Sequence, residues 1–127
     1  MPPIPPRSDD EARVAELKEL VRRFCEERDW AQYHGPKDLA IGVATEAAEL
    51  LAHFRFLSEE ESRALLADEA KRGEVAAEMA DVLYFLLRLS ERNSIDLTAA
   101  LVRKLEENAR RYPVDRARGS NKKYTDL

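Results

Sequence analysis

Residues 39–51 read Leu-Ala-Ile-Gly-Val-Ala-Thr-Glu-Ala-Ala-Glu-Leu-Leu, so that Glu46 and Glu49 stand in an almost entirely apolar run. A second run, residues 75–83, reads Val-Ala-Ala-Glu-Met-Ala-Asp-Val-Leu and carries Glu78 and Asp81 at the same spacing. Both runs are rich in helix-forming residues, and residues three apart lie on one face of a helix. Each pair therefore projects two carboxylates from a helix whose other residues favour burial.

Carboxylates on apolar helix faces need a partner, because an unpaired buried charge is very costly. A divalent cation between the two pairs would neutralise their mutual repulsion, and all-oxygen ligation suits Mg²⁺, with Mn²⁺ as a possible substitute. A di-iron site is disfavoured, since the Glu-x-x-His pairs typical of di-iron bundles are absent. The pattern alone leaves a solvated acidic face equally open, because such pairs are common on exposed helices.

The composition predicts an all-α protein. The chain has 127 residues and only four glycines, and its 44% apolar and 36% charged residues fit one globular domain with a charged exterior. We expect a four- to five-helix bundle. Its helices are predicted at residues 8–28, 37–56, 58–67, 71–92 and 97–111. The expected organisation is a disordered Pro-rich leader (1–7), a helical domain that carries the site (8–112) and a basic C-terminal tail (113–127).

Local signals mark the ends of these helices. Ser8 is a candidate N-cap for the first, Ser58 with Glu61 forms a capping box, and Asp96 is a candidate N-cap for the last, which Pro113 stops. Apolar residues at helical spacing predict the buried stripe of the 71–92 helix: Val75, Met79, Val82, Leu83, Leu86 and Leu89.

Charge and cysteine usage limit the possible partners. The net charge of −4 gives no global basic field for a nucleic-acid polymer. The chain from residue 103 onward is basic, which is typical of a solvated charged tail and also suits a phosphate ligand. Cys25 is the only cysteine, so an internal disulfide is impossible; we expect a buried thiol and a reducing, cytoplasmic setting. No apolar run is long enough to span a bilayer, and the first residues lack an apolar signal core.

The acidic pairs and several further segments together resemble the MazG-like all-α nucleotide pyrophosphohydrolases, and within them the dCTP pyrophosphatase branch. The segments that carry the resemblance are Arg28-Asp-Trp30, His34-Gly-Pro-Lys-Asp-Leu39, Lys104-Leu-Glu-Glu-Asn108-Ala-Arg-Arg111-Tyr112-Pro113 and Ala117-Arg-Gly-Ser-Asn-Lys-Lys123-Tyr124-Thr-Asp-Leu127. The match extends from about Val14 to the end of the printed sequence. The acids combined with Arg-Tyr-Pro and the terminal Lys-Tyr are a specific combination.

The resemblance implies hydrolysis of a nucleoside triphosphate, such as dCTP or a modified dCTP, to the monophosphate and pyrophosphate. It implies Mg²⁺ held by Glu46, Glu49, Glu78 and Asp81, and a homotetramer with sites between subunits. From the chemistry of the acids, we expect Glu46 or Glu49 to act as the general base. The expected substrate-binding residues are Trp30, His34, Phe56, Phe85, Lys104, Asn108, Arg111, Tyr112, Lys123 and Tyr124. The breadth of the apolar surface on the 37–56 helix independently favours self-association.

The chain departs from the branch at three positions. Thr45 precedes Glu46 where the family often has Glu or Gly, Phe56 replaces a tryptophan, and Phe85 replaces a tyrosine, with Tyr84 beside it. Loss of an indole N–H and a phenol hydroxyl changes the groups available to recognise a base. Two other functions remain open at this point: a phosphoribosyl-ATP-type pyrophosphohydrolase and a non-enzymatic helical interaction module.

Overall fold

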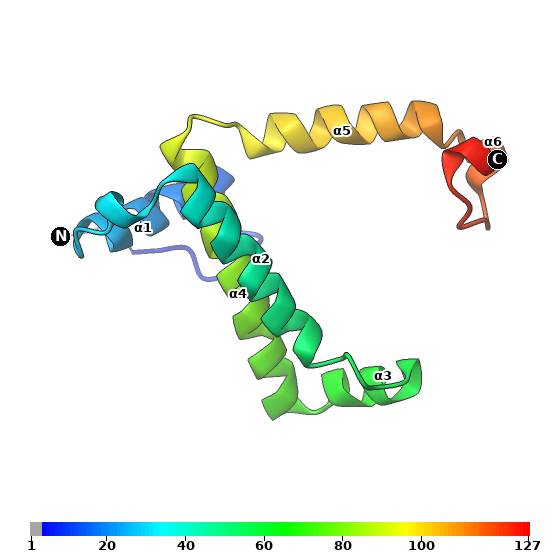
Figure 1. Cartoon of the computed structure of the whole chain (residues 1–127), viewed down its shortest axis with the longest axis horizontal. Coiled ribbons are helices and arrows are strands. Elements are labelled where there is room, and N and C mark those ends of the chain that lie inside the picture. Colours follow the sequence, from blue (N-terminus) through cyan, green and yellow to red (C-terminus); the bar gives the residue numbers. More distant parts are fainter. Residues whose placement is uncertain (1–3) are drawn as a thin grey trace. The chain divides into compact units, whose positions relative to one another are not determined.

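The structure is a computed structural model, and it describes residues 4–127. Within that range every regular element is helical, which confirms the all-α fold class (Figure 1). The chain divides into two compact units, one ending at Ser94 and the other comprising Ile95–Leu127. In the described residues, no helix is both long and apolar enough to cross a membrane.

The first unit is built around α4 (Glu69–Arg92), which contacts α1 (Val14–Glu26), α2 (Pro36–Ala52) and α3 (Glu59–Ala67). Helices α2 and α4 run side by side over most of their lengths (Figure 1). Their shared core contains Leu39 and Gly42 from α2 and Val75 and Leu87 from α4. This packing places the two acidic runs of the sequence on neighbouring helices.

Helix α1 begins later than the sequence predicts. Ser8 does not start the helix: its carbonyl accepts the N–H of Glu11 in a turn, and the Glu11 carboxylate accepts the N–H of Arg7 at 3.1 Å. The helix starts after Arg13, whose N–H donates to the carboxylate of Glu16 at 3.1 Å. Glu16 thus satisfies a backbone donor near the helix start, and the acidic segment before it is left as a turn.

Side chains also cap the starts of α3 and α4, of which only the first was predicted. The Glu61 N–H donates to Ser58 Oγ at 3.1 Å and the Ser58 N–H donates to Glu61 Oε1 at 3.0 Å, which confirms the capping box of α3. Asp68 accepts the N–H of Lys71 at the start of α4. Helix α2 begins at Pro36, where a proline is tolerated because the first helical N–H has no partner within the helix. It is followed by turns instead of continuing to Phe56.

The leader lies partly within the described residues. Residues 1–3 of the predicted disordered leader lie outside them. Ile4, Pro5 and Pro6 line a cavity of about 280 Å³ together with residues of α1.

The second unit contains α5 (Leu97–Arg111), α6 (Val114–Ala117) and a short 3₁₀ turn, η2 (Tyr124–Asp126). Asp96 accepts the N–H of Ala99 at 2.8 Å, which confirms the predicted N-cap, and α5 ends before Pro113 as expected. The sequence analysis did not predict α6 or η2. Both are single turns, too short to show an apolar period.

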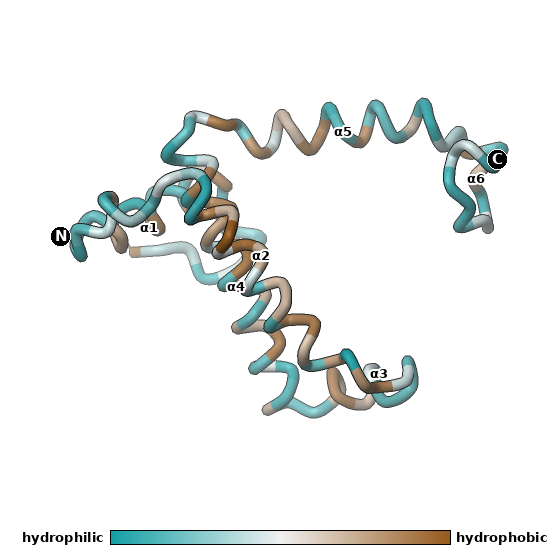
Figure 2. Tube along the Cα trace, viewed as in Figure 1, coloured by the Kyte–Doolittle hydropathy of each residue, from teal (hydrophilic) through white to brown (hydrophobic). Residues whose placement is uncertain are grey.

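Much of the apolar surface is exposed in the single chain. Of the buried stripe predicted for α4, Val75 is buried, but Met79, Leu83 and Leu86 are exposed, and Leu87 is buried instead. Figure 2 shows strongly hydrophobic residues along α2 and α4. The prediction of a fully buried stripe was wrong because α1, α2 and α3 together cover only part of α4. Met79 also lines an apolar hollow of about 490 Å³ with Leu50, Leu51 and Leu66.

Candidate functional site

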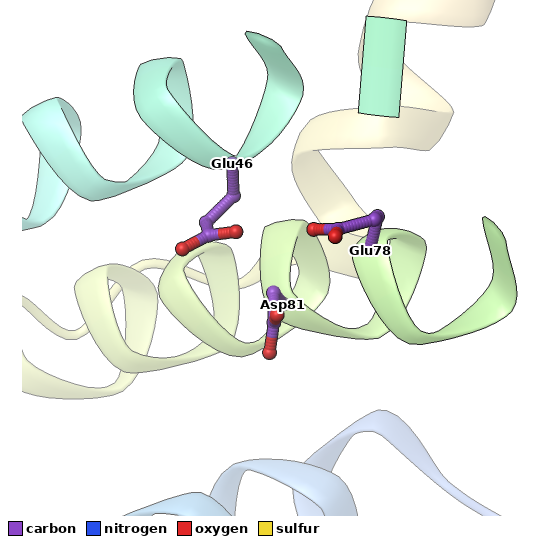
Figure 3. Close-up of side chains that lie close together, drawn as sticks. All are labelled: Glu46, Glu78 and Asp81. Atoms are coloured by element: carbon purple, nitrogen blue, oxygen red, sulfur yellow. The ribbon is translucent and has the colours of Figure 1, made fainter. Parts of the chain in front are cut away.

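Three of the four predicted acids converge. Glu46 extends from α2 toward α4, which carries Glu78 and Asp81 (Figure 3). One carboxylate oxygen from each lies within 4.8 Å of the others. Glu49 is exposed and is not part of this group, although its charge acts on Glu46. We call Glu46, Glu78 and Asp81 the acidic triad.

The electrostatics of the triad are those of a site for a cation. Burial raises the pKa of Glu46, and the neighbouring carboxylates of Asp81, Glu78 and Glu49 raise this pKa further, as does a hydrogen bond with Glu78. Like charges held this close disfavour joint ionisation. Since every donor is a carboxylate oxygen, the triad fits a hard divalent cation better than a soft metal.

Metal-free protein should show this repulsion as a pH-dependent loss of stability. The pKa of Glu46 is raised in the folded state, so folding favours the protonated carboxyl. Its contribution to the free energy of unfolding is fully present below the ordinary pKa of 4.5, and it is lost as the pH rises through the pKa of the folded state. Glu46→Gln removes that titration. We therefore expect the free energy of unfolding of Glu46→Gln, relative to wild type, to increase as the pH rises above 4.5.

Urea unfolding in EDTA at several pH values measures this difference. Near neutral pH, saturating Mg²⁺ should stabilise the wild type alone, so that the wild type becomes more stable than Glu46→Gln. Glu74→Gln is the matched control, because Glu74 lies on the same helix but pairs with Lys71. A pH-independent difference for Glu46→Gln would contradict the prediction.

His53 also lies beside the triad, and the sequence analysis did not assign it to the site. Its Nε2 is 3.9 Å from Glu78 Oε1. His53 follows Glu49 by four residues at the C-terminal end of α2, so it continues the acidic face of that helix. That spacing is the sequence signal that could have identified His53 as a site residue. Its contact with Glu78, however, depends on how α2 packs on α4.

A hollow of about 440 Å³ connects the acids to aromatic side chains. It is lined by Phe24, Trp30, Glu46, Ala80, Asp81, Tyr84 and Phe85. We call this hollow the aromatic pocket. Trp30 and Phe85, two of the residues expected to bind substrate, therefore share one cavity with two acids of the triad. Its lining combines flat apolar rings with carboxylates, the two features that a base and a metal-bound phosphate require.

Edge-to-face contacts order these rings. Phe24 packs against Trp30 with ring centroids 5.7 Å apart and against Tyr84 at 6.2 Å, and Tyr84 packs against Phe85 at 5.0 Å. The Tyr84 hydroxyl lies 3.1 Å from the sulfur of Cys25, and burial raises the Tyr84 pKa. Cys25 is buried, as the sequence predicts. In the dCTP pyrophosphatase branch a tyrosine stands at the position of Phe85. The Tyr84 hydroxyl does not simply take the place of that missing hydroxyl, because it already has Cys25 as a partner.

The other two expected residues of the first unit do not line the aromatic pocket. His34 lies behind Trp30, with ring centroids 6.2 Å apart, and its Nδ1 accepts a hydrogen bond from Arg88 Nε. Phe56 is 86% exposed and carries the Arg55 guanidinium over its ring at 5.0 Å. Arg88 was not predicted as a site residue, because charged residues on helices are ordinarily exposed.

Four of the expected substrate-binding residues gather in the second unit. The Tyr112 and Tyr124 rings are 5.9 Å apart, and the Arg111 guanidinium and Lys123 ammonium lie 5.0 and 5.9 Å from the Tyr124 ring centroid. Glu107 pairs with Arg111 at 2.9 Å and with Lys104 at 3.7 Å. The Asn108 carbonyl accepts the N–H of Tyr112 at 2.8 Å. The second unit therefore holds a compact basic and aromatic cluster.

Known proteins are similar to this chain over most of its length. Residues 41–127 match the sequence model of the MazG-like family. The chain is 36% identical over 123 residues to dCTP pyrophosphatase 1 of Mus musculus, covering 97% of this chain and 72% of that protein. It is 34% identical over 117 residues to dCTP pyrophosphatase 1 of Homo sapiens, covering 92% and 69%.

A solved structure agrees with these matches. A pyrophosphatase from Archaeoglobus fulgidus superposes with a TM-score of 0.74 at 38% identity, covering 87% of this chain and 99% of that one. The matched region includes the whole acidic triad and the second unit. On this evidence the chain belongs to the MazG-like family.

Proposed function

We propose that the protein is a Mg²⁺-dependent nucleoside triphosphate pyrophosphohydrolase that cleaves dCTP or a modified dCTP between the α and β phosphates. The observation that carries this proposal is the aromatic pocket, where Trp30 and Phe85 share one hollow with Glu46 and Asp81. The similarity to proteins named dCTP pyrophosphatase 1 supports the reaction and the base.

The residues of the triad fit the metal. Glu46, Glu78 and Asp81 offer carboxylate oxygens only, and Glu49, one helical turn from Glu46, is proposed as a fourth ligand or as a base. When bound, Mg²⁺ would neutralise phosphate oxygens and stabilise the charge that develops on them. Glu46 or Glu49 is proposed to accept the proton of the attacking water.

The aromatic residues are proposed to hold the base. Trp30 and Phe85 present apolar rings to the pocket, and stacking on such rings is tolerant of base identity. Phe85 offers the pocket no hydroxyl, so the side-chain donor expected at this position in the dCTP pyrophosphatase branch is missing here. We expect discrimination among pyrimidines to depend on the shape of the pocket, including the position of Trp30, which His34 contacts.

The cluster of the second unit is proposed to bind phosphates. Arg111 and Lys123 supply cationic donors, and Tyr112 and Tyr124 hold them close together. Lys104 and Asn108, on the same helix α5, are proposed to contact phosphate and sugar.

A pyrophosphate-release panel tests the proposal. We expect hydrolysis of dCTP or 5-substituted dCTP with Mg²⁺, weaker hydrolysis with Mn²⁺, and none in EDTA. The products should be the nucleoside monophosphate and pyrophosphate in equal amounts, measured by ion-exchange chromatography. Release of single phosphates, turnover in EDTA, or turnover of phosphoribosyl-ATP alone would overturn it.

We also propose that the protein acts as a homotetramer. The exposed apolar residues Met79, Leu83 and Leu86 on α4 and Ile41 and Leu51 on α2 support self-association. Light scattering coupled to size exclusion should give four times the 14.5 kDa chain mass at micromolar concentration. Leu83→Glu should lower that mass, whereas Glu74→Lys, a charge change on the same helix, should not. A monomeric wild type would contradict the proposal.

A further inference from the structure

Arg88 is an unusual side chain for a helix of this kind, because its guanidinium is almost completely buried, with 1% of the side chain exposed. Its Nη1 donates to Glu91 Oε2 at 2.8 Å and its Nε donates to His34 Nδ1 at 2.9 Å. Nη2 is buried and has no hydrogen-bond partner among the described residues. A charge buried this deeply must be paired, and Glu91 supplies the counter-charge.

The bond to His34 determines where the imidazole carries its proton. Arginine nitrogens donate hydrogen bonds and do not accept them, and arginine stays protonated at all ordinary pH values. Nδ1 of His34 must therefore offer a lone pair. An imidazole with a free lone pair on Nδ1 is neutral, and its proton lies on Nε2.

His34 also forms part of the support of the aromatic pocket. Its ring packs edge-to-face against Trp30, and Trp30 lines the pocket with Glu46 and Asp81. A continuous chain of contacts thus runs from the buried guanidinium on α4, through the loop before α2, to the ring proposed to stack on the base. Arg88 is therefore the hydrogen-bond partner that holds Nδ1 of His34.

We propose that Arg88 is a positioning residue, which holds His34 as the neutral Nε2–H tautomer against Trp30 and so orders the base-side wall of the pocket. The consequence for nucleotides rests on the proposed function. His34 does not line the pocket, so its effect on the base acts through the position of the Trp30 ring. Arg88 itself does not contact substrate.

The charges around His34 agree with a neutral ring. Burial lowers the His34 pKa, as do the charges of Arg88 and Arg92 on α4, while Asp38 on α2 and Glu91 on α4 oppose that shift. The lowered pKa favours the neutral ring, in agreement with the hydrogen bond from Arg88.

Nitrogen-15 NMR of the histidine rings tests the proposal without any enzyme activity. The chain has two histidines, so His53→Gln assigns both spectra. In the wild type we expect a pyrrole-type Nε2 and a pyridine-type Nδ1 for His34, with titration below the ordinary value of 6.5. Arg88→Met should give a mixture of tautomers and a higher midpoint. Arg92→Met, the matched control, removes a charge without touching the hydrogen bond and should keep the tautomer.

A second variant keeps the test valid if Arg88→Met leaves Glu91 unpaired and fails to fold. Arg88→Met with Glu91→Met replaces both members of the buried pair with apolar side chains, an exchange that proteins often tolerate. It should show the same loss of tautomer preference. A protonated Nδ1 in the wild type, or an unchanged His34 spectrum in the variants, would overturn the proposal.

Kinetics then separate this inference from the proposed function. We expect the Arg88 variants to raise KM for the triphosphate about tenfold, the scale of one lost hydrogen-bond contact, with kcat changed less than about threefold. Arg92→Met should leave KM near that of the wild type. A wild type with the expected spectrum but no hydrolysis overturns the proposed function alone. A lost tautomer preference with unchanged KM overturns the role of Arg88 in the pocket.

Discussion

Asp81→Asn is expected to reduce kcat for pyrophosphate release by about 10²- to 10³-fold, the scale of removing one electrostatic catalytic group. The substitution keeps the shape of the side chain but removes one negative ligand from the acidic triad, whose oxygens lie within 4.8 Å of one another. Asp81 also lines the aromatic pocket, so its charge faces the proposed substrate. Steady-state hydrolysis of dCTP with saturating Mg²⁺ measures the effect.

The fold of this variant should be intact. Removal of a like charge from the triad relieves repulsion on Glu46, so the metal-free variant is expected to be at least as stable as the wild type. Far-ultraviolet circular dichroism and thermal unfolding in EDTA check this point. Glu74→Gln on the same helix serves as the control and should retain full activity, since Glu74 pairs with Lys71 outside the triad. Near-wild-type turnover of Asp81→Asn would rule out the triad as the metal site.

Gly42→Ala is expected to lower the free energy of unfolding by about 1–3 kcal/mol, the usual cost of overpacking a core. Gly42 is buried in α2, and a Cβ built on it would lie 2.5 Å from Cδ1 and Cε1 of the Phe85 ring. The ring cannot remain in place, because real Cβ atoms do not approach other heavy atoms so closely. Since Phe85 lines the aromatic pocket, its displacement should also raise KM. Urea unfolding and steady-state kinetics measure the two effects.

Gly73→Ala is the matched control for this prediction. Gly73 lies in α4, and an added Cβ there would meet nothing within 4 Å. The same substitution should therefore stabilise the protein by up to about 1 kcal/mol through helix propensity. Adding Phe85→Leu to Gly42→Ala should restore part of the lost stability by making room for the methyl group. Equal changes in the free energy of unfolding for Gly42→Ala and Gly73→Ala would show that the position of the Phe85 ring does not depend on Gly42.

Local sequence signals determined most of the secondary structure. Capping residues such as Ser58, Asp96 and Pro113 act on backbone groups within a few residues, so their effect can be read without knowing the fold. The start of α1 was nevertheless predicted too early, because local signals alone do not choose between two candidate starts. Ser8 and Arg13 both precede acids able to satisfy the first N–H groups, and the competition between them was resolved in favour of Arg13 with Glu16.

The candidate site was less predictable, because it depends on contacts between helices. Spacing places Glu78 and Asp81 on one face of α4, but only the packing of α2 on α4 brings Glu46 to them and leaves Glu49 outside the group. The resemblance to the MazG-like family supplied residue roles that spacing does not contain. It did not predict that Phe56 would be exposed while Phe85 lines the pocket.

The sequence by itself determined that the chain is helical, that two acidic pairs interrupt its most apolar runs, and that Cys25 is buried, since these features follow from residue type and period. The tertiary structure alone decided which three acids converge, that Phe85 lies against Gly42, and that Arg88 is buried behind His34. The reason is physical. These contacts join residues far apart in the chain, and they depend on side-chain volume and on the pairing of buried charge.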